Sequence, residues 1–95
     1  MIVELSKSSK ANKRFKVVID GRKTIHFGLK NGSTFIDHKD SMKKNAWIAR
    51  HKVRGTFNNP KSASFYAKNL LWNKDSLQKS IKDTNQKYKI QIQYK

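Results

Sequence analysis

The stretch from Arg14 to Gly28 constrains the fold most, because two alternating apolar runs flank the pair Asp20-Gly21. Asp-Gly readily takes the positive φ angles of a type I′ turn, so the pattern predicts a β-hairpin with a two-residue turn. The residues that alternation places on one face are Phe15, Val17 and Ile19 in the first strand and Ile25 and Phe27 in the second. His26 falls on the opposite face, where we expect a solvated or cross-strand-paired imidazole.

Two further strands are expected at the ends of the chain. Ile2, Val3 and Leu5 form a short apolar run, and residues 88–94 alternate strictly between apolar or aromatic and polar side chains. The second run predicts a half-buried strand. After Asn31-Gly32, a turn signal, residues 33–36 are either a short strand or the start of the next helix.

Residues 37–53 lack glycine and proline and carry apolar side chains at helical spacing, which predicts the main helix. The stripe consists of Met42, Ala46, Ala49 and Val53, widened by Trp47 and Ile48. Asp37 is expected to cap its start, with Asp40 in its first turn and Gly55 as a left-handed cap after its end. Acids at the start and cations at the end each contribute about 0.3–1 kcal/mol through the helix dipole.

Ser62 is expected to cap a second helix that runs through Trp72. Its buried face comprises Phe65, Tyr66, Leu70 and Leu71. Asp75 or Ser76 then starts a third, shorter helix, on which Leu77 and Ile81 stand one turn apart. The aromatic residues on or beside these helix faces, which we expect mostly in the core, are Trp47, Phe57, Phe65, Tyr66 and Trp72.

This order of elements predicts an α+β fold. The small, mostly antiparallel sheet combines the N-terminal strand, the hairpin and the C-terminal strand, and two to three helices cover it. The 95 residues are expected to form one basic domain (1–95), with a lysine-rich loop at about 6–13. The chain has no cysteine, and no stretch approaches the roughly 20 apolar residues of a membrane span. We therefore expect neither disulfides nor a membrane-spanning segment.

Charge is the strongest functional signal. Lys and Arg number 22 against six acids, which gives a formal charge of +16 and points to a polyanionic partner. Lysine outnumbers arginine 18 to 4, which favours nonspecific contact over bidentate base recognition. The densest candidates for polyanion binding are Lys7, Lys10, Lys13, Arg14, Lys16, Arg22 and Lys23 in the loop and hairpin, and Arg50, Lys52 and Arg54 at the end of the main helix.

Catalytic and metal sites are weakly supported. Asp37-His38, Asn45 and His51 follow the order of a His-Asn-His nuclease, but on one helix Asn45 and His51 would stand roughly 240° apart. The chain lacks thiolates and a histidine pair at zinc-binding spacing, although a three-histidine site assembled by tertiary contacts stays open. We therefore predict no catalytic residue, no metal and no cofactor, and expect no enzyme.

Several short motifs occur in a specific order: TIHFG (24–28), HKD (38–40), IARH (48–51), Asn59-Pro60 and LLW (70–72) followed by Ile81. In these motifs the chain resembles, over roughly residues 14–85, a family of small basic proteins of unknown function from large nucleocytoplasmic DNA viruses. The resemblance implies a viral origin and no known catalytic residues.

Two functions fit this resemblance and the charge. The first is a virion-associated minor capsid or cement-type protein that contacts acidic capsid proteins or the packaged genome. The alternative is a nonspecific nucleic-acid-binding protein that acts in the infected cell. Either function places the protein in the virion, or in the host cytoplasm or virus factory before assembly, without a small-molecule substrate.

Overall fold

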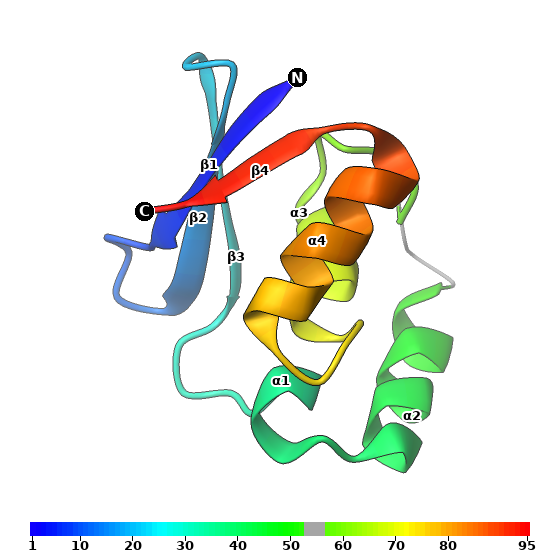
Figure 1. Ribbon diagram of the computed structural model, residues 1–95. Coiled ribbons are helices and arrows are strands. Elements are labelled where there is room, and N and C mark those ends of the chain that lie inside the picture. Colours follow the sequence, from blue (N-terminus) through cyan, green and yellow to red (C-terminus); the bar gives the residue numbers. More distant parts are fainter. Residues whose placement is uncertain (53–56) are drawn as a thin grey trace.

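The computed structural model describes residues 1–52 and 57–95. Its four-stranded sheet has the order β3-β2-β1-β4, where β1 is antiparallel to β2 and parallel to β4 (Figure 1). The strands are β1 (Ile2–Lys7), β2 (Lys13–Ile19), β3 (Lys23–Leu29) and β4 (Gln91–Tyr94). The predicted α+β fold with a mostly antiparallel sheet is therefore confirmed.

The hairpin forms where it was predicted, but its register differs by one residue. Asp20 and Gly21 both have positive φ, and the N–H of Arg22 donates to the carbonyl of Ile19 at 2.9 Å, as in a type I′ turn. Ile19 then pairs with Lys23, so three residues, and not two, separate the first paired positions. The Asp20 carboxylate also accepts from the Ile2 N–H, which ties this turn to β1.

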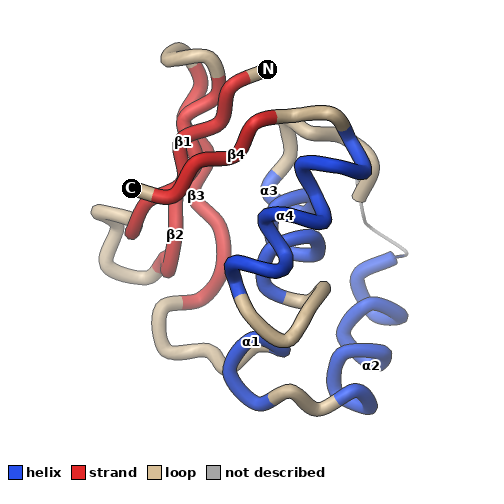
Figure 2. The backbone as a smooth tube through the Cα atoms, viewed as in Figure 1, coloured by secondary structure: helices blue, strands red, loops and turns tan. Residues whose placement is uncertain are grey.

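Helices lie on one side of the sheet, and loops connect them as Figure 2 shows. The helical elements are α1 (Phe35–His38), α2 (Ser41–Lys52), α3 (Ala63–Tyr66), the π-helical turn η1 (Ala67–Leu71) and α4 (Leu77–Tyr88). α3, η1 and α4 contact the sheet strands, whereas α2 lies beyond them, at the far side of the molecule from the sheet (Figure 1). The core between sheet and helices includes Val3, Leu5, Val17, Phe27, Phe65, Tyr66 and Leu70.

The single helix predicted over residues 37–53 is wrong in its first part. Lys39 adopts a left-handed conformation with φ 57°, so α1 ends there and α2 begins at Ser41. Asp40, and not Asp37, accepts hydrogen bonds from the first N–H groups of α2, those of Met42 and Lys43. Residues 33 and 34 lead into α1, and residues 35 and 36 are its first two residues, so this stretch is the start of a helix and not a strand.

The expected apolar stripe of the main helix is mostly exposed to solvent and does not form a buried face. Met42 is 82% exposed, Ala46 and Ala49 are exposed, and α2 contains no fully buried residue. Trp47 and Ile48 alone are partly buried among the stripe residues that the structure describes. Val53, Arg54 and the expected cap Gly55 lie outside the described residues.

The later elements agree with prediction except at their ends. Ser62 and Ser76 cap α3 and α4 by accepting from Phe65 and Lys79 N–H groups, as expected. α4 is longer than predicted and includes Tyr88, which was expected in the C-terminal strand. The left-handed Lys89 ends the helix, and β4 begins only at Gln91. The lysine-rich loop shortens to residues 8–12, since β1 extends through Lys7.

Gly28 allows the sheet and η1 to approach closely. Its φ is +76°, and a Cβ there would stand 2.9 Å from Leu71 Cδ1 and 3.3 Å from Arg14 Cβ. Leu71 is buried, so it has little room to move.

We expect Gly28→Ala to lower the free energy of unfolding by about 2–4 kcal/mol, because it adds both a left-handed penalty and overpacking. Gly21→Ala is the matched control: its φ is +68° and no atom lies within 4 Å of an added Cβ. The control should cost only about 1–2 kcal/mol in urea denaturation. Equal losses in the two variants would contradict the close approach of β3 and η1.

Candidate functional site

An ion pair fixes α1 against the sheet. Both terminal nitrogens of Arg14 on β2 donate to the Asp37 carboxylate, at 2.6 and 2.8 Å. The same carboxylate accepts from the N–H and the hydroxyl of Thr34, and the bond from the N–H is that of a capping box, with Thr34 as N-cap and Asp37 as the third residue of α1. The Arg14 guanidinium, helped by Thr34, outweighs partial burial and holds the pKa of Asp37 well below its usual range.

The short turn between α1 and α2 is held by His38. Its Nδ1 accepts from the Asp40 N–H at 3.0 Å, so the neutral ring carries its proton on Nε2. That Nε2 is buried without a hydrogen-bond partner among the described residues. The ring centroid lies 5.4 Å from that of Trp72, so His38 packs on an indole in place of a polar partner.

Aromatic rings form a column where α2 meets η1. Trp47 stacks on Trp72 with centroids 5.1 Å apart and planes 10° apart, and the His51 ring stacks on Trp47 at 4.2 Å. Phe57 lies 5.9 Å from Trp47, and His38 continues the column beyond Trp72. Because α2 contains no fully buried residue, this column is its main attachment to the remainder of the protein.

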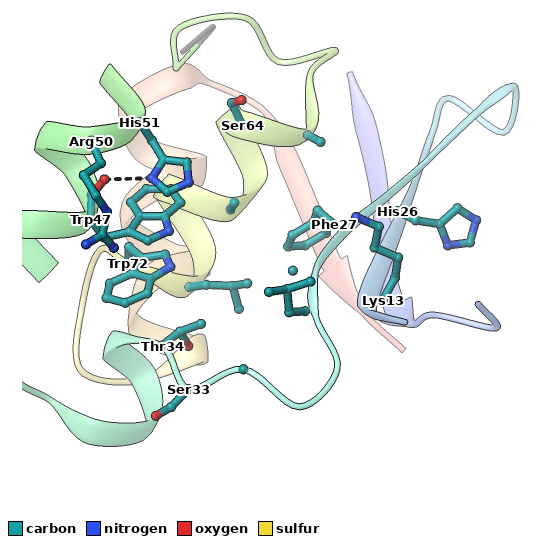
Figure 3. A pocket seen from close by; sticks show the side chains of 16 residues that line it. Lys13, His26, Phe27, Ser33, Thr34, Trp47, Arg50, His51, Ser64 and Trp72 are labelled. Carbon is teal, nitrogen blue, oxygen red and sulfur yellow. Dashed lines mark hydrogen bonds between the residues drawn. The ribbon is translucent and has the colours of Figure 1, made fainter. Parts of the chain in front are cut away.

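The column borders a cavity of about 520 Å³ (Figure 3). The cavity lies between α2, the segment that joins β3 to α1, and the α3–η1 helix pair. Its lining includes Trp47, Arg50, His51, Phe27, Ser33, Thr34, Ser64, Ala67, Leu71, Trp72 and Lys13. Among the described residues no acid lines it, and Arg50 and Lys13 add positive charge at separate edges.

The predicted polyanion-binding residues do not form one patch. Lys7, Lys10 and Lys13 lie at the end of the sheet where Lys13 pairs with Leu29, whereas Arg22 and Lys23 lie at the turn. β2 rises by six residues between these two ends, which corresponds to a distance of roughly 20 Å. Arg50 and Lys52 are exposed on α2, and Arg54 lies outside the described residues. Their role in binding stays a prediction.

Around His26 the structure does gather cations. Its Nδ1 lies 2.7 Å from the Ser8 hydroxyl oxygen, on the outer face of the sheet opposite Lys16, as expected for a paired imidazole. Burial and then the nearby charges of Lys10, Lys16 and Lys13 lower the pKa of His26. The loop end of the sheet is therefore a cationic region.

A second group of lysines was missed by sequence reasoning. Burial, and then the charges of Lys87 and Lys44, lower the pKa of Lys68, whose ammonium lies 5.5 Å from the Phe57 ring centroid. These lysines come from α2, η1 and α4, so no local pattern marks them. The cavity was missed for the same reason, although both tryptophans were noted as helix-face residues.

The nuclease and metal interpretations gain no support from this geometry. Asp37 is bound to Arg14, His38 Nδ1 to the Asp40 N–H, and His51 Nδ1 lies 2.9 Å from the Trp47 carbonyl. Across residues 1–52 and 57–95 no three potential ligands stand close enough to hold a metal ion.

The fold and site define a small, strongly basic α+β protein with an aromatic cavity. A family model described as "Family of unknown function (DUF5754)" matches residues 3–51, 49 of the 95 residues, and the chain belongs to this family. The match covers the sheet hairpin, α1 and α2. No curated protein and no solved structure matches the chain. In the part of the chain that the structure describes, no helix has the length and apolarity to cross a membrane.

We expect Asp37→Asn to lower the free energy of unfolding by about 1–2 kcal/mol at pH 7, a value reduced for the partial exposure of the pair. Because folding lowers the pKa of Asp37, its stabilisation is complete above the unfolded-state pKa of about 4 and is lost as pH falls below it. Urea denaturation between about pH 7 and pH 2 should therefore show a flatter pH dependence in the variant.

Asp75→Asn is the control, because the Asp75–Lys79 pair is exposed on both sides. It should leave stability nearly unchanged. The same loss in both variants at pH 7 would contradict the anchoring role of Asp37.

Proposed function

We propose that this protein is a virus-encoded, virion-associated structural protein of the minor capsid or cement type. Its positive surface would contact acidic surfaces of capsid proteins or the packaged genome. The proposal is supported by the formal charge of +16 and by the motif resemblance to proteins of large nucleocytoplasmic DNA viruses. We assign it no catalytic residue, metal or cofactor.

The observation that carries the proposal is that the fold itself uses all six carboxylates. Three form ion pairs: Glu4 with Lys95, Asp37 with Arg14 and Asp75 with Lys79. The other three accept hydrogen bonds within the chain: Asp20 from Ile2, Asp40 from α2, and Asp83 from Asn73. The large excess of lysine therefore has no internal acid to neutralise it and is available to a partner.

The alternative is a nonspecific nucleic-acid-binding protein that acts in the infected cell. The spread of cations supports it, because exposed basic residues stand at both ends of the sheet and on α2. Such a distribution suits contact with phosphates by counterion release more than reading of a base sequence.

We expect the protein to bind duplex DNA in fluorescence anisotropy with submicromolar affinity at about 150 mM salt and a steep dependence on salt from about 50 to 300 mM. Charge reversal of Lys7 and Lys10 at one end of the sheet, or of Arg22 and Lys23 at the other, should reduce the slope of log K against log salt concentration. In each case the reduction should correspond to about two lost phosphate contacts. Asp75→Asn is the control. Loss of binding by about 150 mM would leave acidic protein surfaces as the partner.

The two proposals differ in where the protein is found. Mass spectrometry of purified, nuclease-treated virions should detect the chain if it is a virion component. Its absence from virions, together with DNA binding at physiological salt, would overturn the first proposal in favour of the alternative.

A further inference from the structure

The cavity beside α2 offers unused hydrogen-bond donors. Within residues 1–52 and 57–95 neither the Trp47 nor the Trp72 indole N–H donates a hydrogen bond. The one buried side-chain polar atom without a partner in this part of the chain is Nε2 of His38, so both indole nitrogens keep access to solvent. Both rings border the cavity (Figure 3), and a donor that folding leaves unpaired there can serve a ligand.

The remaining polar groups at the cavity favour an anion. Arg50 extends from the same helix as Trp47, and no ion pair occupies its guanidinium among the described residues. Lys13 adds a second cation from β2. His51 Nδ1 must donate to the Trp47 carbonyl, since a carbonyl only accepts, so Nε2 of the neutral ring is left as an acceptor for an N–H donor of the ligand and does not itself contact the anion.

The cavity also has an apolar side. Phe27, Ala67 and Leu71 are among its lining residues, and its volume of about 520 Å³ lies within the usual range for small-ligand sites. A ligand that matches these walls combines a flat aromatic group with an anionic group rich in acceptors. A nucleotide has this composition, because its base carries acceptors for the indole N–H groups while its phosphate meets cations.

We propose that this cavity binds one phosphorylated nucleotide, whose base lies against the edge of the Trp47–Trp72 column, where the indole N–H groups are unpaired, and whose phosphate contacts Arg50. The nucleotide is either a unit of single-stranded nucleic acid or free in solution. A duplex does not fit, because its bases are paired and stacked. The inference rests on the proposed binding of polyanions and adds a site that distinguishes single strands from duplexes.

The two cavity tryptophans are the only tryptophans in the chain, so intrinsic fluorescence reports on the cavity directly. We would titrate the full-length protein at about 150 mM salt with an oligothymidine of roughly ten nucleotides, with thymidine monophosphate and with a duplex of matched length. The single strand should quench the emission saturably, and the duplex should bind by anisotropy with little quenching. Saturable quenching by the mononucleotide alone would support the site and identify a free nucleotide as its ligand.

Arg50→Glu and Lys52→Glu form the matched pair of variants. Both residues are exposed on α2, both changes lower the formal charge by two, and Lys52 does not line the cavity. Arg50→Glu should weaken single-strand binding about tenfold more than Lys52→Glu, while duplex binding falls equally in the two. Circular dichroism checks that both variants fold.

The outcomes separate this inference from the proposed function. Duplex binding without quenching by any single strand or nucleotide, or equal effects of the two variants on single-strand binding, would overturn the cavity site and leave the polyanion proposal intact. Saturable quenching by thymidine monophosphate without duplex binding would support the cavity and overturn duplex DNA as a partner. Absence of binding to all three probes would overturn the cavity site and nucleic acid as a partner, and would leave acidic protein surfaces as the partner in the proposed function.

Discussion

The Arg14–Asp37 ion pair joins the sheet to α1 and, because α2 follows α1 directly, also sets the position of α2. Arg14 belongs to β2, and the carboxylate it binds also closes the start of α1 through Thr34. The left-handed Lys39 then turns the chain into α2, which carries Trp47 onto Trp72. A bidentate pair has a defined direction as well as energy, so it sets where α1 begins and thereby where α2 lies.

The hairpin and its faces could be predicted because local rules determine them. Asp20 and Gly21 adopt the positive φ angles that the turn requires. The alternation of Phe15, Val17 and Ile19 places all three on one face of β2, and that face is buried. The break between α1 and α2 could not be predicted, because Lys39 has no sequence mark of a left-handed residue. The apolar stripe of α2 misled for a related reason: its period is helical, but the described helix is held by partly buried Trp47 and Ile48 and by a hydrogen bond from Lys44 to the Asn73 carbonyl.

The candidate site depends on contacts between distant parts of the chain. Trp47 and Trp72 stand 25 residues apart, and the lysines around Lys68 come from three elements. The net charge, in contrast, is visible in the composition, and the structure adds where the acids lie: each one forms an ion pair or accepts a hydrogen bond within the chain. The excess of 16 positive charges therefore has no acidic partner within the chain.

The two proposals fit together: the positive charge would attract polyanions, and the cavity would add a preference for an unpaired base.

The most direct test is an NMR titration of the ¹⁵N-labelled protein with a short single-stranded oligonucleotide at physiological salt. The chain has two tryptophans, so two indole N–H resonances report on the cavity. We predict that both move as the strand binds, together with amides of α2. Shifts confined to the loop between β1 and β2 and to the hairpin turn, with both indole resonances unchanged, would contradict the account.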